Sequence, residues 1–549
     1  MRHDQWFGRR LDRRTLLRLA GGAVLAVPAA SLLAGCGAGS DGGGGTSVTS
    51  TPDQATQSTG AEPRRGGTLR VALTGEPPNL DLHQTTDSIV LLVTGHVYET
   101  LFTWDERYEP VPMLAESHEV TDGGRRILVR LRQGVPFHNG EEMRAEDVIA
   151  SIERWGRIVG LGQGLMAVTE SLTAVDPYAV EFRLREPFGT FPTALSRALQ
   201  GCAIYPKSVL ERSDDTKLAE FVGTGPYRFV EWQPDRHILL ERFDGYANPP
   251  GETNGYAGHK GQYLDEIEFI PVPNEASRVA GLRSGDYHYL ETISTDHYPT
   301  LKDDPAVAVD MLPPDTWLNI VLNLRSPITS DLQIRRAIQL ALDHEPILQA
   351  AFGEGFYELT PTLLPGAAAW YSDAGADRFN PRKPDEARRL LESSSYDGSP
   401  LRVLTTQEIQ QEYNATVVFK QQLEQVGFTV DLQVYDGATL SDRRNDEEAW
   451  EAYTALASFR PDPVLRNLTC SATGWWCTPE KDELLAQLQT ESDFEKRVEI
   501  WAQVQQRFYE EVPRLKIGDS RRILVRSPQL QGIGPTELQP DFSNAWLET

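Results

Sequence analysis

The sequence predicts a mixed α/β fold, and three observations predict it. Short runs rich in β-branched residues recur along the chain, bounded by Gly, Pro or Asp, which is typical of β-strands. Other segments carry apolar residues at the spacing of an α-helix. Near Gly427 the apolar period changes from about 3.6 to about 2, which indicates a helix followed directly by a strand. No repeat of roughly 20–50 residues occurs, so neither a solenoid nor a propeller is expected.

Five strands are predicted from these runs. They are TLRVAL at 68–73, ILVRLR at 127–132, AVEFRL at 179–184, DEIEFIPV at 265–272 and LNIVLNL at 318–324. A sixth is expected from Phe428 to Val434, where apolar and polar residues alternate.

Three helices are predicted with their ends. Ser330 or Asp331 can cap one whose inward residues run from Ile334 to Leu342, with Pro346 beyond. A second has an apolar face from Ala415 to Val426 and Gly427 at the C′ position. A third has its apolar face from Phe494 to Phe508 and ends before Pro513.

Composition narrows the class of protein. The 549 residues include 45 Gly and 36 Pro, with 40% hydrophobic and 24% charged residues, which is typical of a globular chain. At about 150 residues per domain, three or four domains are expected. The formal charge of −26 repels phosphate backbones and anionic lipid headgroups. We therefore expect no nucleic-acid partner, and membrane attachment would need an anchor.

The first 35 residues have the layout of a signal peptide. A basic stretch up to Arg18 precedes an apolar run from Leu19 to Ala34, which is shorter than the ~20 residues that span a bilayer. A buried core helix is the alternative. Within the basic stretch, residues 12–18 (DRRTLLR) resemble a twin-arginine export signal, although paired arginines also occur in signals of the ordinary export route.

The residues Leu33-Ala34-Gly35-Cys36 resemble a bacterial lipobox. This resemblance implies cleavage before Cys36 and lipidation of its thiol, which would supply the apolar anchor. Residues 36–65 are dominated by Gly, Ser and Thr and predict a flexible tether with a reach of about 30 Å. The expected location is the outer face of the cytoplasmic membrane.

Common catalytic signatures are missing from the sequence. It contains no G-x-S-x-G elbow, no H-E-x-x-H pair and no G-x-x-x-x-G-K-[ST] loop, so we do not expect an enzyme. The ten His are scattered, so no metal site and no cofactor is expected. The glycine-rich residues 160–164 lack the spacing of a dinucleotide-binding motif and predict a flexible loop.

Three cysteines remain besides Cys36. Cys470 and Cys477 are close enough in sequence to form a disulfide across a tight loop, and two unpaired thiols are the alternative. Cys202 has no obvious partner.

Several segments in order resemble the family 5 extracytoplasmic solute-binding proteins, the peptide- and nickel-binding receptors of ABC importers. They are GGTLRVALTGEPPNLDLH at 66–83, the stretch from Pro112 to Asp147 with DGGRRILVRLRQGVPFHNG, GTGPYRFVEW at 223–232, LRSGDYHYL at 282–290 and NLRSPITSDLQIRRAIQLALDHEPI at 323–347. The resemblance implies a two-lobed periplasmic-binding-protein fold (type II, the large variant with an inserted domain). Lobe I would comprise 66–107, 192–313 and 512–549, the inserted domain 108–191, and lobe II 314–511.

The resemblance also implies ligand-contacting residues. Peptide binders of the family often carry an Asp in an A-D-Y-x-D-P-like stretch that pairs with the ligand's amino terminus. Here the stretch is ASFRPDP at 457–463, so Phe459 stands where that Asp would be and Arg460 follows. A guanidinium at this place can bind a carboxylate or a phosphate. We therefore expect Arg460 to contact an anionic ligand group; an ion pair with Asp462 is the alternative.

Five further residues are candidates for the site. Trp317, Trp475 and Trp476 could cover a ligand, although core packing is the commoner use of an indole. The Asn323 amide could meet ligand carbonyls or hydrogen bond its own loop. Asp87 follows the first strand where family members approach ligand, but it can equally be an ordinary loop residue.

The expected function is capture of a peptide or another small, anionic solute by hinge closure, with delivery to ABC permease subunits in the membrane. A monomer is expected. A metal-chelate receptor of the same family, a secreted hydrolase, and a sensor or adhesion module remain as alternatives.

Overall fold

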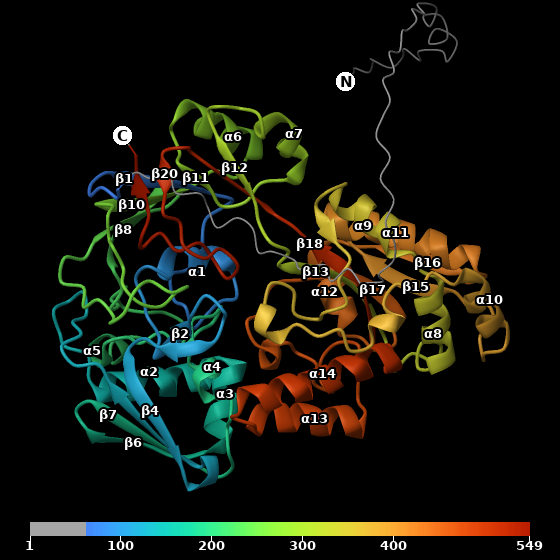
Figure 1. Cartoon of the computed structure of the whole chain (residues 1–549), viewed down its shortest axis with the longest axis horizontal. Coiled ribbons are helices and arrows are strands. Elements are labelled where there is room, and N and C mark those ends of the chain that lie inside the picture. The colour runs from blue at the N-terminus through green and yellow to red at the C-terminus, as the bar shows by residue number, and fades with distance from the viewer. Residues whose placement is uncertain (1–61, 549) are drawn as a thin grey trace, which may run out of the picture. The chain divides into compact units, whose positions relative to one another are not determined.

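A computed structural model describes residues 62–548, and Figure 1 shows how their helices and strands are arranged. The expected signal peptide, Cys36 and most of the expected tether lie outside the described residues. None of the helices in the described range is both long and apolar enough to cross a membrane.

The first sheet has seven strands in the order β12-β19-β11-β1-β10-β9-β8. Their bounds are β1 Thr68–Leu73, β8 Tyr227–Gln233, β9 His237–Arg242, β10 Glu266–Pro271, β11 Tyr289–Leu290, β12 Ala308–Met311 and β19 Ile523–Arg526. The predicted strand β1 lies inside this sheet and pairs in parallel with β10 and β11. The helices are α1 Ser88–Thr94, α5 Lys207–Leu210, α6 Glu275–Ser284 and α7 Tyr298–Leu301, with the short η2 Thr295–His297. We call this sheet and its helices the first lobe.

A second, four-stranded antiparallel sheet is inserted into the first lobe, in the order β4-β5-β7-β6. Its strands are β4 Ala115–Thr121, β5 Arg126–Leu131, β6 Thr169–Asp176 and β7 Ala179–Leu184. Nearby lie β2 Phe102–Trp104, β3 Pro110–Pro112, η1 Asp122–Gly124, α2 Ala145–Ile158, α3 Gly160–Val168 and α4 Phe191–Ala194. The inward residues of β5 and β7 pack on Trp155 of α2 and form a core of their own. We call this unit the insert.

The loop prediction for residues 160–164 is wrong, because these residues begin helix α3. Gly162 lies against the ring of Trp155, where an added Cβ atom would be 2.7 Å from Cε3. The glycine is there for close packing of α3 on α2, and Leu165 is buried in the same core. Tertiary packing thus outweighs the low helix propensity of glycine.

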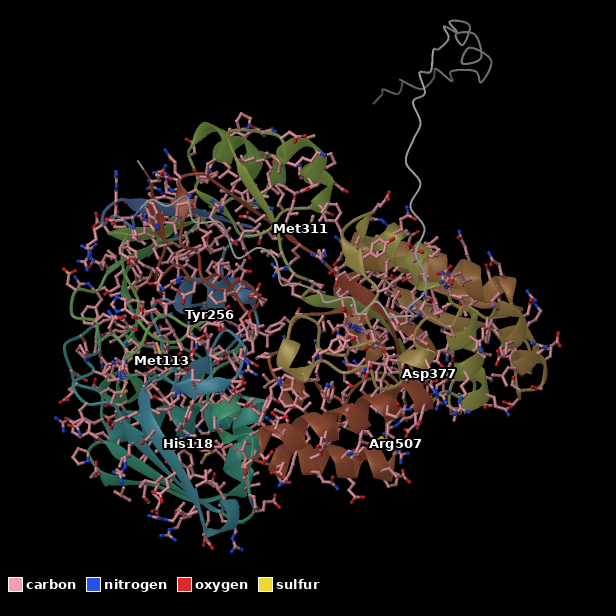
Figure 2. The ribbon with its side chains drawn as sticks, viewed as in Figure 1. Met113, His118, Tyr256, Met311, Asp377 and Arg507 are labelled. Carbon is pink, nitrogen blue, oxygen red and sulfur yellow. A yellow bond between two sulfur atoms is a disulfide. The ribbon has the colours of Figure 1, made fainter. Side chains whose placement is uncertain are left out.

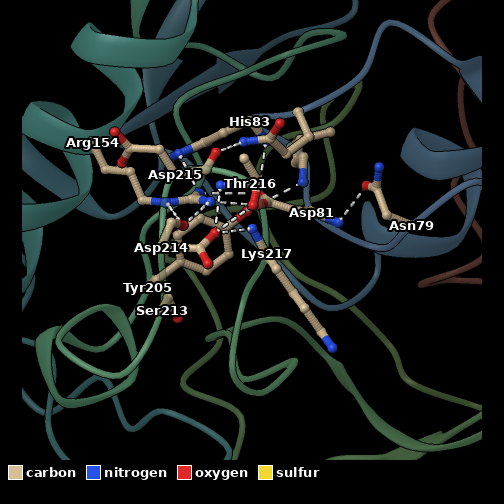
Figure 3. A network of polar contacts seen from close by, with 12 residues as sticks. Asn79, Asp81, His83, Arg154, Tyr205, Ser213, Asp214, Asp215, Thr216 and Lys217 are labelled. Carbon is tan, nitrogen blue, oxygen red and sulfur yellow. Dashed lines mark hydrogen bonds and ion pairs between the residues drawn. The ribbon is translucent and has the colours of Figure 1, made fainter.

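A polar network ties the insert to the first lobe (Figure 3). Arg154 of α2 pairs with Asp81, which follows β1, through contacts of 2.6 and 3.2 Å, and both side chains are buried. Arg154 also donates to Asp214 O at 3.0 Å, and Tyr205 donates to Asp81 at 3.2 Å. His83 lies beside Arg154, with Nδ1 at 3.3 Å from Nη1. Because this ion pair is fully desolvated, it fixes the insert on the first lobe at one geometry.

The third large sheet has the order β14-β18-β13-β17-β15-β16 and belongs to what we call the second lobe. Its strands are β13 Thr316–Leu322, β14 Tyr357–Glu358, β15 Leu401–Thr405, β16 Val430–Val434, β17 Ala452–Ala457 and β18 Arg514–Ser520. Its helices are α8 Leu332–Ala341, α9 His344–Phe352, α10 Pro384–Glu392, α11 Gln410–Gln425, α12 Gly437–Arg444, α13 Pro479–Thr490 and α14 Phe494–Glu511, with η3 Ala368–Trp370, η4 Ala376–Arg378 and η5 Pro463–Leu465. A small hairpin, β20 Leu530–Gln531 with β21 Trp546–Leu547, completes the strands of the described range.

The three predicted helices of this lobe are confirmed. Asp331 caps α8 by accepting from Gln333 N at 2.7 Å. Helix α11 ends at Gln425, and Gly427 takes a φ of 107°, a left-handed value that a Cβ atom would strain. Helix α14 ends at Glu511, two residues before Pro513.

Two segments cross between the first sheet and the third. The chain leaves β12 at Met311, enters β13 at Thr316, and returns between Ser520 of β18 and Ile523 of β19. Figure 2 shows Met311 at the first crossing, with Met113 and Tyr256 on the side of the first lobe and Asp377 and Arg507 in the second. The returning strand β18, expected in lobe I as part of 512–549, pairs instead in the sheet of the second lobe. Lobe II extends to about residue 520 because β18 pairs with β13 and β14.

Candidate functional site

The segment that follows β17, residues 457–466, is where the second lobe touches the first lobe and its insert. The ring of Phe459 packs on Tyr108 of the β2–β3 turn, with centroids 4.6 Å apart. Thr193 of α4 donates from Oγ1 to Asp462 Oδ2 at 3.1 Å. These contacts are additional to the two strand crossings, so a ligand held by this segment lies close to both lobes.

Both carboxylate oxygens of Asp462 accept hydrogen bonds from the protein. It caps η5 by accepting from Val464 N at 3.0 Å, and it accepts two 2.8 Å hydrogen bonds from Arg497 of α14. The pairing of Arg460 with Asp462, offered above as the alternative, is therefore not formed. Asp462 instead fixes the shape of the loop that carries Arg460.

Arg460 is partly buried. Its Nη1 donates to Phe459 O at 2.8 Å, and no carboxylate of the described residues forms an ion pair with it. Burial lowers the pKa of Arg460, which means that the surroundings disfavour its charge.

Arg466, six residues further on, was not anticipated from the sequence. Burial lowers its pKa to about 9, and the nearby charges of Arg460 and Arg514 lower it as well, against the opposing effect of Asp519. Arg514, the first residue of β18, has a pKa that burial also lowers, and its Nη2 donates to Thr473 O at 3.3 Å. We call Arg460, Arg466 and Arg514 the arginine cluster.

Trp317, a predicted site residue, lies at this cluster. It stands near the start of β13 with 2% of its surface exposed. The guanidinium of Arg466 lies 5.3 Å and the Lys516 ammonium 5.6 Å from its ring centroids, so the indole carries two cation–π contacts. The ring also packs on Phe508 of α14, so Trp317 belongs to the core as well.

Lys516 and Asp519 of β18 form a buried ion pair beside the cluster, with the two charged atoms 2.7 Å apart. Lys516 also donates to Thr362 O. Burial lowers the pKa of Lys516 and raises that of Asp519, and their mutual attraction opposes both shifts. Asp519 pairs with Lys516 and also favours the charge of Arg466, and no described carboxylate forms an ion pair with Arg460, Arg466 or Arg514.

The other predicted site residues of the second lobe are not part of the arginine cluster. Asn323 uses its whole amide within the protein: Nδ2 donates to Glu447 O and Trp450 O of the segment before β17, and Oδ1 accepts from Arg325 N of its own loop. A ligand would have to displace one of these bonds.

Cys470 and Cys477 form a disulfide, and Cys202 is a buried free thiol. The loop that the disulfide closes carries Trp475 and Trp476. Trp475 packs on Trp450 at 5.7 Å, and Trp476 is buried and donates from Nε1 to Glu511 at 2.6 Å.

Asp87 stands on the first lobe, apart from the arginine cluster. It caps α1 by accepting from Ile89 N at 3.0 Å. Burial raises the pKa of the neighbouring Glu291, and the charge of Asp87 adds to this shift. Glu291 accepts from both N and Oγ1 of Thr74, directly after β1.

The described residues contain no group of three or more His, Cys, Asp or Glu placed to hold a metal ion.

Two lobes joined by two strand crossings, with an insert on the first lobe and buried ionic groups near the contact between the lobes, define a two-lobed solute-binding protein. Similarity to known proteins agrees with this class. Residues 109–474 match the model of the bacterial extracellular solute-binding proteins, family 5 Middle, and the chain belongs to this family. Members of the family are transport receptors and not enzymes.

Two relatives illustrate the similarity. A probable peptide ABC transporter periplasmic-binding protein, y4tO, of Sinorhizobium fredii is 24% identical over 462 residues, which cover 80% of this chain and 86% of that protein. The oligopeptide-binding protein AppA of Bacillus subtilis is 25% identical over 483 residues, covering 82% and 86%.

Solved structures share the fold. The DppA periplasmic binding protein of Helicobacter pylori, in complex with the peptide STSA, has a TM-score of 0.72 at 22% identity and covers 88% of this chain and 99% of its own. AgaA of A. tumefaciens R10, in complex with agropinic acid, has a TM-score of 0.70 at 22% identity, with coverage of 88% and 99%.

Proposed function

We propose that this chain is the substrate-binding receptor of an ABC importer, and that it captures a small anionic solute between its lobes by hinge closure. The observation that carries the proposal is the position of segment 457–466. This segment holds Arg460 and Arg466, which form no ion pair with a carboxylate in residues 62–548, and it also contacts Tyr108 and Thr193 across the lobes. A ligand bound here gains contacts that depend on how close the lobes are.

Hinge closure is expected because ligand binding is coupled to the equilibrium between the open and closed forms. A ligand shifts the balance between open and closed forms only by its difference in affinity for the two. Because the segment lies next to residues of both lobes, a ligand on it favours the closed form. The membrane permease would then recognise the closed receptor.

The attachment to the membrane belongs to the same proposal. A twin-arginine signal, cleavage before Cys36 and lipidation of its thiol would keep the receptor, acting as a monomer, near its permease outside the cytoplasm. The relative y4tO is named a periplasmic-binding protein, which is consistent with an extracytoplasmic place of action.

The ligand class is proposed from this chain's residues. Relatives and structural neighbours bind ligands that range from peptides to agropinic acid. In this chain Phe459 stands where peptide binders of the family often have an Asp and Arg460 follows it, so the ligand should present a negative group to the second lobe.

The experiment has two measurements. Mass spectrometry identifies what co-purifies with the protein, and small-angle scattering and thermal unfolding then follow its rebinding. A smaller radius of gyration and a higher Tm on binding support the proposal. A bound solute that changes neither would contradict hinge closure, and Arg460→Ala with unchanged affinity would contradict the role of Arg460.

A further inference from the structure

Polar atoms without partners gather on one face of the second lobe's sheet, beside the arginine cluster. They are Trp317 Nε1, Asn319 Oδ1, and Nε and Nη2 of Arg466, all buried and none with a hydrogen-bond partner among the described residues. Asp519 Oδ1, on the neighbouring strand β18, likewise has no hydrogen-bond partner there and has only the Lys516 ion pair. Trp317 and Asn319 are two apart on β13 and so face the same side. Arg466 lies over the Trp317 ring. Three donors and two acceptors, one of them the Lys516-paired oxygen of Asp519, therefore lie in this region.

Arg466 differs from the arginines that this fold uses for structure. Arg335 forms no ion pair with a described carboxylate either, but it donates to the backbone carbonyls of Thr329, Ser330 and Glu511 at 2.7–3.0 Å. Arg497 and Arg154 each have a carboxylate. A buried guanidinium with two nitrogens that donate no hydrogen bond lowers the stability of the fold, unless another group accepts hydrogen bonds from them.

Arg197 of the first lobe is the closest comparison, because its Nε and Nη2 also lack partners. A cavity of about 30 Å³ adjoins Arg197 and is lined by Lys260, Asp541 and Ser543 among others. This volume and these polar groups suit a water molecule. Lys260 and Asp541 already pair at 2.8 Å, so local charge is balanced there.

At Arg466 the charge is not balanced. Arg460 and Arg514 add positive charge nearby, and Asp519 is held by Lys516. A water molecule could satisfy the hydrogen bonds but would leave the positive charge. A doubly charged anion satisfies both requirements, because its oxygens accept from Arg466 and from Trp317 Nε1.

We propose that Arg466, with Trp317 Nε1 and the flanking Arg460 and Arg514, forms the subsite for a ligand group that carries two or more negative charges. The group is a phosphate ester or a pair of carboxylates, since both present several acceptor oxygens. Asn319 Oδ1 accepts from a hydroxyl or amide donor next to the anionic group. This inference rests on the proposed receptor function and names the ligand class of the same site.

The first test uses sulfate as the probe, so it needs no knowledge of the natural ligand. Thermal unfolding is measured in sodium sulfate and in sodium chloride at equal ionic strength, for the wild type, Arg466→Gln and the control Arg125→Gln. Arg125 lies in the insert, with 51% of its side chain exposed, and pairs with Asp122. We expect sulfate to raise the Tm of the wild type and the control more than that of Arg466→Gln. An equal sulfate effect in all three proteins overturns the proposal.

The second test uses the co-purified solute. We expect it to carry at least two acidic groups and to bind about 10- to 100-fold more weakly to Arg466→Gln than to Arg125→Gln, the range for a charge-assisted hydrogen bond. Affinity for phosphoserine and for the dipeptide Glu-Glu separates the phosphate from the dicarboxylate form, with Gln-Gln as the neutral control. If Arg466→Gln does not fold, Arg460→Gln and Asn319→Ala replace it in both tests.

The outcomes separate this inference from the function on which it rests. A neutral solute that closes the lobes overturns the anionic subsite and leaves the receptor function intact. A crystal structure with water alone on Arg466, and the solute elsewhere between the lobes, does the same. A co-purified polyanion that leaves the radius of gyration unchanged supports the subsite and contradicts the receptor mechanism.

Discussion

Asp315 and Arg522 form an ion pair between the two crossings that join the lobes. Arg522 Nε donates to Asp315 Oδ2 at 2.7 Å, and Nη2 contacts the same oxygen. Burial disfavours the charge of Arg522, but Asp315 outweighs this effect and raises its pKa. Backbone bonds run alongside, from Leu312 N to Arg522 O at 2.9 Å and from Asp315 N to Ser520 O at 3.3 Å. The two crossings are therefore linked to each other by side-chain and backbone bonds.

Asp315→Asn should loosen this link between the crossings. The carboxylate is buried but the Arg522 side chain is 41% exposed, so we expect a loss of about 1–2 kcal/mol of stability, less than for a fully buried pair. The radius of gyration without ligand should increase. The control is Asp304→Asn, whose partner Arg283 is comparably exposed but lies away from the crossings. Equal radii for the two variants would argue against a hinge role.

Thr193→Val should weaken ligand binding without changing the ligand's own contacts. It removes the Thr193–Asp462 hydrogen bond across the lobes and leaves the Arg497–Asp462 pair in place. A neutral donor to a carboxylate contributes about 1 kcal/mol, so affinity should fall roughly fivefold in calorimetry. Thr300→Val, which removes a bond to His297 O within the first lobe, is the control. A drop of the same size in the control would refute the explanation.

Arg154→Met should be among the most destabilising single changes to the first lobe. It leaves Asp81 buried without its partner, which costs about 3–5 kcal/mol. Urea unfolding measures the loss. The double variant Asp81→Asn with Arg154→Met should be less destabilised than the sum of its single variants, because no lone charge remains. Strict additivity would show that the two side chains do not interact.

Stability should fall as the pH drops below about 6.5, and His83 should contribute. Burial lowers the pKa of His83 to about 3, with Arg154 also disfavouring its charge and Asp81 opposing. Between pH 6.5 and pH 3 this side chain is protonated in the unfolded chain but neutral in the folded chain. The free energy of unfolding therefore decreases as the pH falls through this range. One such group contributes at most about 1.4 kcal/mol per pH unit.

His83→Asn should flatten this dependence in urea titrations at several pH values. An Asn side chain can still accept from Arg154 and donate to Ala203 O, the present partners of the ring. The exposed His259→Asn serves as the reference. An unchanged slope in His83→Asn would assign the acid sensitivity to other groups.

Removing the disulfide should destabilise the second lobe modestly. The loop between Cys470 and Cys477 is short, and the chain-entropy model assigns its closure about 2.5 kcal/mol. The double variant Cys470→Ser with Cys477→Ser should lose about this amount in thermal unfolding. Tryptophan fluorescence should change as well, because the loop carries Trp475 and Trp476. A double variant as stable as the wild type would show that packing alone holds the loop.

Local patterns predict the elements whose residues alternate or repeat cleanly. β7 and α11 are examples, and the change of period at Gly427 locates the end of α11. β18 was not predicted as a strand because the buried Lys516 and Asp519 break its apolar pattern. Its place in the sheet comes from pairing with β13, which is invisible in the local sequence.

The residues of the candidate site also differ in whether the local sequence predicts them. Arg460 is recognisable because it stands in a motif that usually carries an acidic group. Arg514 lies more than 50 residues away in sequence and reaches the cluster only through β18, whereas Arg466 follows a short helical turn without any distinctive pattern. Unsatisfied atoms such as Trp317 Nε1 become apparent only once the neighbours of each side chain are known.

The strands before and after the second lobe, β12 and β19, are antiparallel neighbours in one sheet. The whole stretch between them therefore leaves the first sheet at the end of β12 and returns to the same sheet at the neighbouring strand β19. Such a stretch can be exchanged for its counterpart from another receptor while the parent sheet keeps its pairing. Recombination at Met311 and Ile523 is therefore a direct route to transplanting ligand preference between members of this family.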